Sequence, residues 1–219
     1  YCRMPLYYRE TIGIKGILDW AKDWGADGII GQLYNEIDLE LLVDSKIPVV
    51  AQDFKERFSE IPNITGAYHE AGEMGASYFL KKGFKNFAFY GFNDIVWSRE
   101  RAEGFEKKIN AMGYKVNYFE HRKSRSTDLW YYKSNSLSKW LLSLPKPIAL
   151  MTCDDNQGLH ITEACKQNKI RIPEEVAVLG VDNDEMLCEL SDPPLSSIGL
   201  DIEKGGYDTA KLMEQMIQT

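Results

Sequence analysis

The sequence predicts an α/β fold built from two doubly wound lobes, each with a mostly parallel sheet. Short apolar, β-branched runs alternate with stretches of helical apolar spacing along the whole chain, which favours parallel strands joined by right-handed crossovers. About seven strand-like runs can be distinguished, more than one small sheet usually holds, so two lobes fit better than one. Polar residues also recur just past the ends of these runs, where open α/β sheets bind ligands.

Local signals place the elements of the first third of the chain. Gly25 and Gly28 end a helical stretch, because glycine is favoured just past a helix end. The run IPVVA is rich in β-branched residues and predicts a buried strand. The expected elements are a strand over 1–8, a helix over 11–24, a strand over 29–33, a short helix over 39–43, a strand over 47–51 and a loop or edge strand over 61–66.

The remaining two thirds show the same alternation. Pro193 and Pro194 predict an extended segment, because each proline disfavours helix at the residue before it. The polar, basic stretch 121–127 predicts a mobile loop. The expected helices cover 69–82, 98–112, 128–144, 155–168 and 203–217, and the expected strands cover 86–91, 115–119, 148–152 and 176–181.

Composition narrows the class of protein. The chain has 219 residues, a formal net charge of −7 and a pI of about 5.1. It therefore lacks the excess positive charge that favours binding to nucleic acid or acidic lipid. No apolar run approaches the roughly 20 residues that cross a bilayer, and no signal peptide opens the chain. Cys2, Cys153, Cys165 and Cys188 lack CxxC spacing, which predicts free thiols in a reducing compartment. We therefore expect a cytoplasmic protein with no membrane partner.

Four polar residues at predicted strand ends are candidate ligand contacts: Gln32, Asp53, Asp154 and Asp182. Such positions face the crevice at the carboxyl ends of parallel strands. An alternative for Asp182 is that it only caps the next short helix, a role that aspartate fills well.

Trp97 and Arg101 form a second candidate cluster at a helix start. The planar guanidinium fork suits vicinal hydroxyls or a carboxylate, and an indole face suits the apolar face of a sugar ring. With several aspartates nearby, these residues suit a neutral polyhydroxyl ligand. The alternatives are that Trp97 is a core aromatic and that Arg101 forms a surface ion pair with Glu100 or Glu103.

Enzymatic signatures are absent from the sequence. It contains no GxSxG, HExxH, GxxxxGK[ST] or GxGxxG motif, and its three histidines lack metal-ligand spacing. Asp154 and Asp182 could act as an acid/base pair, but carboxylates at strand ends more often hydrogen-bond a ligand or cap a helix. The sequence therefore predicts a binding protein without cofactor or metal, with a sugar-processing enzyme as the alternative.

Several segments resemble the effector-binding core of the LacI/GalR family, whose fold is that of type I periplasmic binding proteins. Their order and spacing extend over nearly the whole chain. The segments are IPVVAQD (47–53), YHEAGEMGASYFLKKGFKNFAFYG (68–91), RERAEGF (99–105), IALMTCDDNQG (148–158), IPEEVAVLGVDN (172–183) and PPLSSI (193–198).

The resemblance implies a lobe over 1–67 and 196–219, a second lobe over 68–195, and a ligand cleft between them, with the fold incomplete at both ends. It assigns ligand binding to Arg101 and Asp182, stacking to Trp97, and further cleft contacts to Gln32 and Asp53. Asp154 stands where many relatives have a ligand-binding asparagine.

The same resemblance points to a partner set. Within the family, the resemblance favours regulators that sense a pentose such as D-xylose. These regulators bind operator DNA through an AraC-type helix-turn-helix domain, which this chain does not include. A homodimer is implied, and Met74 and Tyr78 on the helix over 69–82 offer apolar surface for it. A sugar-binding protein of a transport system is the alternative with the same fold.

Overall fold

A computed structural model of the chain describes residues 6–33, 36–122 and 131–218. Two compact units make up the chain. The first combines Tyr1–Thr65 with Asp201–Thr219, and the second is the continuous segment Gly66–Leu200. The chain therefore leaves the first unit once and returns to it for its last helix.

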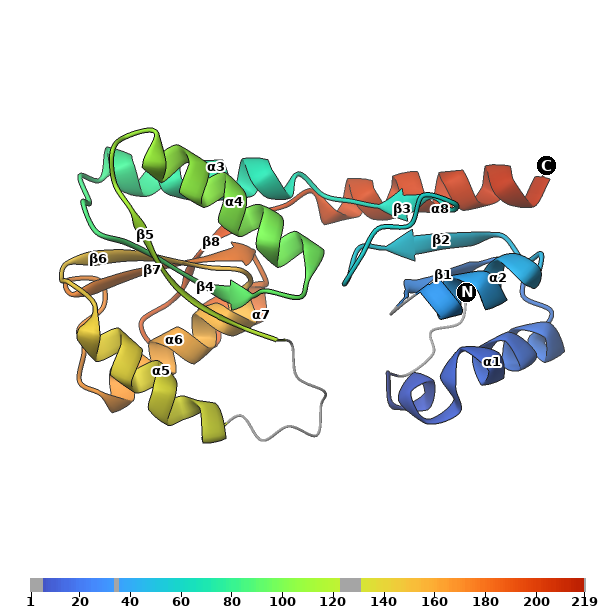
Figure 1. Ribbon diagram of the computed structural model, residues 1–219, viewed down its shortest axis with the longest axis horizontal. Coiled ribbons are helices and arrows are strands. Elements are labelled where there is room, and N and C mark those ends of the chain that lie inside the picture. Colours follow the sequence, from blue (N-terminus) through green and yellow to red (C-terminus); the bar gives the residue numbers. More distant parts are fainter. Residues whose placement is uncertain (1–5, 34–35, 123–130, 219) are drawn as a thin grey trace. The chain divides into compact units, whose positions relative to one another are not determined.

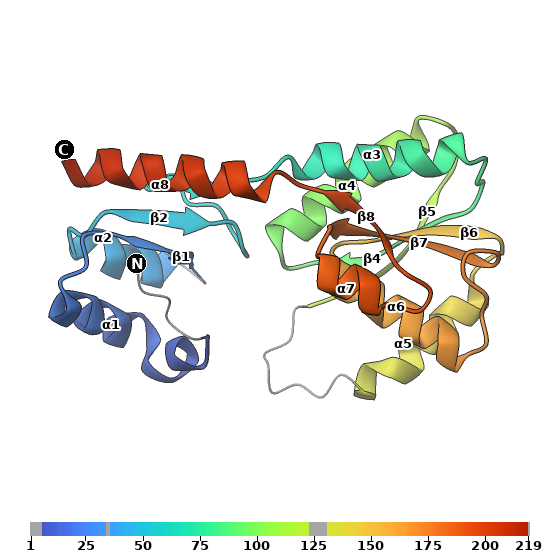
Figure 2. The same ribbon diagram turned by 180° about the vertical axis from the view of Figure 1, so that it is seen from behind.

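The first unit contains a three-stranded parallel sheet in the order β1-β2-β3. Helix α8 lies on one face of this sheet, and α1 and α2 lie on the other (Figures 1 and 2). Leu18, Leu42, Val49 and Phe58 are among the buried residues of its core. The elements are α1 (Leu6–Trp24), β1 (Ile29–Gln32), α2 (Glu36–Asp44), β2 (Val49–Gln52), β3 (Asn63–Ile64) and α8 (Ile202–Gln218).

The strand expected over 1–8 is wrong in its described part, because residues 6–8 belong to helix α1. A short apolar run does not distinguish strand from helix by periodicity, and here the helix forms. Helix α1 is interrupted at Gly13, whose φ of 62° and ψ of −177° are not helical. Glycine adopts this left-handed φ without the steric cost that a Cβ would add.

The second unit contains a five-stranded parallel sheet in the order β5-β4-β6-β7-β8. Helices α3 and α4 cover one face, and α5 and α6 cover the other (Figure 1). These strands confirm the parallel α/β class that the sequence predicts. The elements are α3 (Tyr68–Lys81), β4 (Phe87–Phe92), α4 (Val96–Asn110), β5 (Val116–His121), α5 (Tyr131–Ser143), β6 (Ile148–Thr152), α6 (Asp155–Gln167), β7 (Val176–Asp182), α7 (Glu185–Leu190) and β8 (Ser196–Gly199).

The second unit begins and ends at slightly different residues from those expected. Strand β8 pairs in parallel with β7, with Leu179 opposite Ser196. The segment after Ser196 is therefore part of the second sheet, and the unit extends to Leu200 rather than ending before residue 196. Backbone pairing to β7, which no local pattern reveals, is the reason for the difference.

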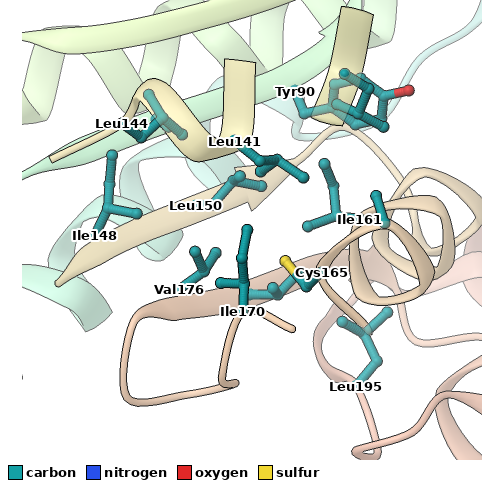
Figure 3. Packing of buried hydrophobic residues seen from close by; sticks show 14 residues of the cluster. Tyr90, Leu141, Leu144, Ile148, Leu150, Ile161, Cys165, Ile170, Val176 and Leu195 are labelled. Atoms are coloured by element: carbon teal, nitrogen blue, oxygen red, sulfur yellow. The ribbon is translucent and has the colours of Figure 1, made fainter. Parts of the chain in front are cut away.

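The core of the second unit has two halves, one on each face of the sheet. Leu141 of α5, Leu150 of β6, Ile161 of α6 and Val176 of β7 are buried together on one face (Figure 3). On the other face, Phe105 of α4 packs edge-on against neighbouring phenylalanines, with a centroid separation of 6.4 Å to Phe79. The sheet is therefore covered by packed side chains on both faces.

Helices α3 and α4 approach each other closely at two glycines. A Cβ at Gly72 would lie 2.1 Å from the Arg101 carbonyl oxygen, and a Cβ at Gly104 would lie 2.1 Å from the His69 carbonyl oxygen. Any larger side chain would push the helices apart. The contact therefore sets the position of α4, the helix that carries Trp97 and Arg101.

None of the helices in the described ranges combines the length and apolarity that crossing a bilayer requires.

Candidate ligand site

The topology of the second unit marks one place on its sheet for a ligand. The connection from β4 runs through α4 to β5 on one side, whereas the connection from β6 runs through α6 to β7 on the other side. Open α/β sheets bind ligands where neighbouring strands diverge in this way, outside their carboxyl ends. The residues that follow β4, β6 and β7 therefore lie where such a fold binds its ligand.

Arg101 lies at this place and links two of these strand ends. Its side chain is only 3% exposed. Its Nη2 donates to Oδ1 of Asp182 at 2.7 Å, and its Nη1 donates to the carbonyl oxygen of Cys153. The structure thus joins Arg101 to Asp182 and not to Glu100 or Glu103, the surface partners that the sequence left open.

Two aromatic rings flank the Arg101 guanidinium. Its Cζ lies 5.1 Å from the ring centroid of Trp97 and 5.3 Å from that of Tyr68, distances typical of cation–π contacts. Trp97 is half-buried and also packs edge-on against Phe92 at 6.0 Å. Sequence reasoning missed Tyr68, because only the packing of α3 on α4 brings the first residue of α3 to Arg101.

Asp182 is held in an unusual backbone conformation. Its φ is 105° and that of Asn183 is 54°, so two successive residues have left-handed backbone angles. Burial raises the pKa of the Asp182 carboxyl, while the charge and hydrogen bond of Arg101 lower it. Helix α7 is capped instead by Asp184, whose Oδ1 accepts from the Leu187 amide. The cap that the sequence offered as an alternative role for Asp182 thus belongs to Asp184.

Asp154 and Asp155 have different surroundings although they are adjacent. Asp154 caps α6, with its Oδ1 accepting from the Gln157 amide at 2.7 Å. Its expected role as a ligand contact therefore coincides with a structural role. Asp155 is buried, and its carboxylate accepts from the Ser197 hydroxyl and the Asp184 amide. Burial raises the pKa of Asp155.

Gln32 and Asp53, the other two predicted site residues, belong to the first unit. Gln32 ends β1 and is paired in register with Gln52. Asp53 is buried, and its Oδ2 accepts from Nε and Nη2 of Arg57 at 3.0 and 2.8 Å. An ion pair within its own unit thus occupies one oxygen of Asp53. The predicted residues that the structure joins directly are Trp97, Arg101 and Asp182.

Among the described residues, no three His, Cys, Asp or Glu side chains are grouped so that they could hold a metal ion. Burial also raises the pKa of Cys153 and raises that of Cys165 to about 12, which keeps both as thiols at neutral pH. The site thus offers hydrogen-bond donors on a guanidinium and acceptors on a carboxylate, beside aromatic rings.

Comparison with known proteins now places the chain in a class. It belongs to the family of periplasmic binding protein-like domains, whose family model matches residues 76–219. Within that class it is an effector-binding domain of the LacI/GalR type, as its sequence predicted.

Particular relatives are regulators of transcription. The chain is 31% identical to the xylose operon regulatory protein of Haemophilus influenzae, over 97% of this chain and 54% of that protein. It is 24% identical to the transcriptional repressor PurR of Vibrio vulnificus, over all of this chain and 68% of that protein. A LacI-type regulator of Alkaliphilus metalliredigens, solved with D-xylulofuranose, has a similar fold: the TM-score is 0.75 at 21% identity, over 93% of this chain and 74% of that one. The chain spans about half the length of the xylose operon regulator that it matches.

Proposed function

We propose that this chain is the sugar-sensing domain of a bacterial transcription regulator and that it binds D-xylose or a closely related pentose. The observation that carries the proposal is the contact between the buried Arg101 guanidinium and the partly exposed Asp182 carboxylate at the end of β7, with Trp97 beside it. The pair offers donors and acceptors side by side, which is what a ring of hydroxyl groups requires.

Arg101 has donor capacity to spare. Nε of Arg101 is buried and has no hydrogen-bond partner among the described residues. A buried donor without a partner carries a desolvation cost, which an acceptor on a ligand would offset. Asp182 is 36% exposed at its side chain, so its carboxylate is also within reach of hydroxyl groups. These features favour a neutral polyhydroxyl ligand over an anion, which Asp182 would repel.

Two comparisons support a pentose. One relative is named as a xylose operon regulator, and one structural neighbour holds D-xylulofuranose. The PurR relative is named only as a transcriptional repressor and shares less identity. A purine is included in the binding experiment as the competing ligand class.

The proposed regulator acts as a two-state switch in the cytoplasm and has no enzymatic activity. Sugar shifts the domain toward the conformation that binds sugar more tightly. The size of the shift is limited by the difference in sugar affinity between the two conformations. Operator DNA is contacted through an AraC-type helix-turn-helix domain outside this chain. The relatives' naming as regulators favours this role over sugar transport.

The proposal is tested by titration calorimetry with D-xylose, D-xylulose, L-arabinose and hypoxanthine. We expect a pentose to bind with a Kd between micromolar and millimolar, equivalent to about 4–8 kcal/mol. Arg101→Lys should weaken binding at least tenfold, because an ammonium group cannot reproduce the planar fork of donors. Lys108→Gln, an exposed change on the same helix, serves as the control. Binding of hypoxanthine with no binding of any pentose would refute the proposal.

We further propose that the regulator is a homodimer and that α3 contributes to its interface. Met74 and Tyr78 on this helix are 58% and 45% exposed. A two-fold interface uses the same patch on both copies, so Met74→Glu would place like charges opposite each other. Light scattering should show a dimer for the unaltered protein and a monomer for this variant. Met112→Glu, at an equally exposed methionine outside α3, should remain dimeric.

A further inference from the structure

We propose that Asp155 is a positioning residue for ligand binding: it holds the turn that presents the Asp182 carboxylate to Arg101. This inference rests on the proposed function, since it concerns the same Arg101–Asp182 pair. It assigns a role to a buried side chain that has no ligand contact of its own.

The Asp155 carboxylate accepts hydrogen bonds on both of its oxygens. Its Oδ2 accepts from the backbone amide of Asp184 at 2.7 Å. Its Oδ1 accepts from the Ser197 hydroxyl at 2.6 Å, and Ser197 Oγ in turn accepts from the backbone amide of Asn183 at 3.0 Å. The two amides that follow Asp182 are thus both tied to one carboxylate, one directly and one through a hydroxyl.

The turn that these bonds hold would not persist by itself. Asp182 and Asn183 have φ angles of 105° and 54°, in the left-handed region that residues with a Cβ populate rarely. Such angles are retained where surrounding contacts over-determine them, and they occur often at functional sites. The bonds from Asp155 and Ser197 are contacts of that kind, and the side chain that the turn directs is the one that binds Arg101.

The absence of a side chain at Gly180 of β7 makes room for the Asp155 carboxylate against the sheet. A Cβ at Gly180 of β7 would lie 2.1 Å from Asp155 Oδ1, so glycine is needed there. The Cys188 side chain of α7 lies near the Asp155 carboxylate and lowers its pKa. Asp155 therefore connects the start of α6 with β7, α7 and β8.

We do not expect Asp155 to contact the ligand, because both of its oxygens already accept hydrogen bonds within the unit. We therefore expect the effect of Asp155 on affinity to pass through the position of Asp182. This makes the proposal testable by asking whether the two residues act through one another.

A double-mutant cycle on the intact domain provides the test. Asp155→Ala should weaken D-xylose binding at least tenfold in the unaltered background and have no further effect in the Asp182→Ala background. Thr162→Val, at another buried polar residue of α6, is the control and should leave sugar affinity unchanged. Equal losses from Asp155→Ala in both backgrounds would overturn the proposal, because they would indicate a general structural role.

Hydrogen exchange of the sugar-free domain provides a readout that does not depend on sugar binding. The amides of Asn183 and Asp184 should exchange at least tenfold faster in Asp155→Ala, while those of β6 keep their protection. Unchanged exchange at these two amides would overturn the inference, whatever the sugar affinity. Failure of the unaltered domain to bind any pentose, with faster exchange in the variant, would refute only the proposed function. Should Asp155→Ala not fold, Ser197→Ala takes its place in both experiments. This variant removes only the relay to Asn183, so faster exchange is then expected at the Asn183 amide alone.

Discussion

At the residue scale, the candidate site is defined by one buried cation and the carboxylate that it contacts. Burial of Arg101 would be unfavourable without partners, and the structure supplies Asp182, the Cys153 carbonyl and two aromatic rings. Most of the polar residues at the strand ends have a structural task as well. Asp154 caps a helix, Asp155 ties down a turn and Asp53 pairs with Arg57. Substitution of any of these residues would therefore change stability within its own unit as well as any ligand contact.

The burial of Asp155 leads to a prediction about pH. Burial raises the pKa of Asp155, so this group stabilises the fold below its unfolded pKa of about 3.9, and that contribution is lost as the pH rises through the folded pKa. Asp155→Asn removes the titration. The Tm difference, variant minus unaltered protein, should therefore be more positive at about pH 7 than at about pH 4. Thermal unfolding at both pH values measures it; Asp182 titrates in both proteins and largely cancels. A Tm difference independent of pH would show that Asp155 titrates normally in the folded state.

At the element scale, the site depends on how closely two helices pack. Helix α4 carries Trp97 and Arg101, whereas α3 supplies Tyr68 from its first turn. The glycines at the crossing, Gly72 and Gly104, let the two backbones come together. An ordinary preference for residues with high helix propensity would not place glycine inside either helix.

We therefore predict opposite effects of two glycine substitutions. Gly72→Ala would place a Cβ against the Arg101 backbone, and overpacking of this kind costs about 1–3 kcal/mol of unfolding free energy. Because α4 would shift, sugar affinity should fall as well. Gly205→Ala in α8 meets no atom within 4 Å and should stabilise by about 0.5–1 kcal/mol, the helix propensity gain. Urea unfolding of both variants measures these changes; stabilisation by Gly72→Ala would show that the crossing is looser than described.

At the scale of the whole molecule, the two units differ in how the chain builds them. The second unit is one continuous segment with its own two-sided core, whereas the first is assembled from both ends of the chain. Met213 of α8 is buried in the first unit, where a Cβ on Gly28 would lie 2.3 Å from its sulfur. The first unit therefore needs its distant last helix to complete its packing.

This difference predicts the behaviour of fragments. A fragment of residues 66–200 should fold by itself and show cooperative thermal unfolding with a dispersed NMR spectrum, because its core is complete. A fragment of residues 1–65 should not, since it lacks α8. A peptide covering residues 201–219 should restore folding. The helical circular dichroism signal of the mixture should exceed the sum of the signals of the 1–65 fragment and the peptide measured separately. Cooperative unfolding of 1–65 alone would contradict the assignment of α8 to its core.

The sequence alone determined the fold class, the positions of most strands and the family. These rest on apolar periodicity and on the order of short motifs, and both are local properties of the chain. The strand ends also indicated where polar side chains would gather. Tertiary structure alone decided what each polar residue does: Arg101 pairs with Asp182, 81 residues away, and Asp184 rather than Asp182 caps the short helix. Tyr68 and Asp155 gained their roles in the same way. Hydrogen bonds and ring contacts between distant residues depend on how helices and strands pack together, and no local pattern encodes that.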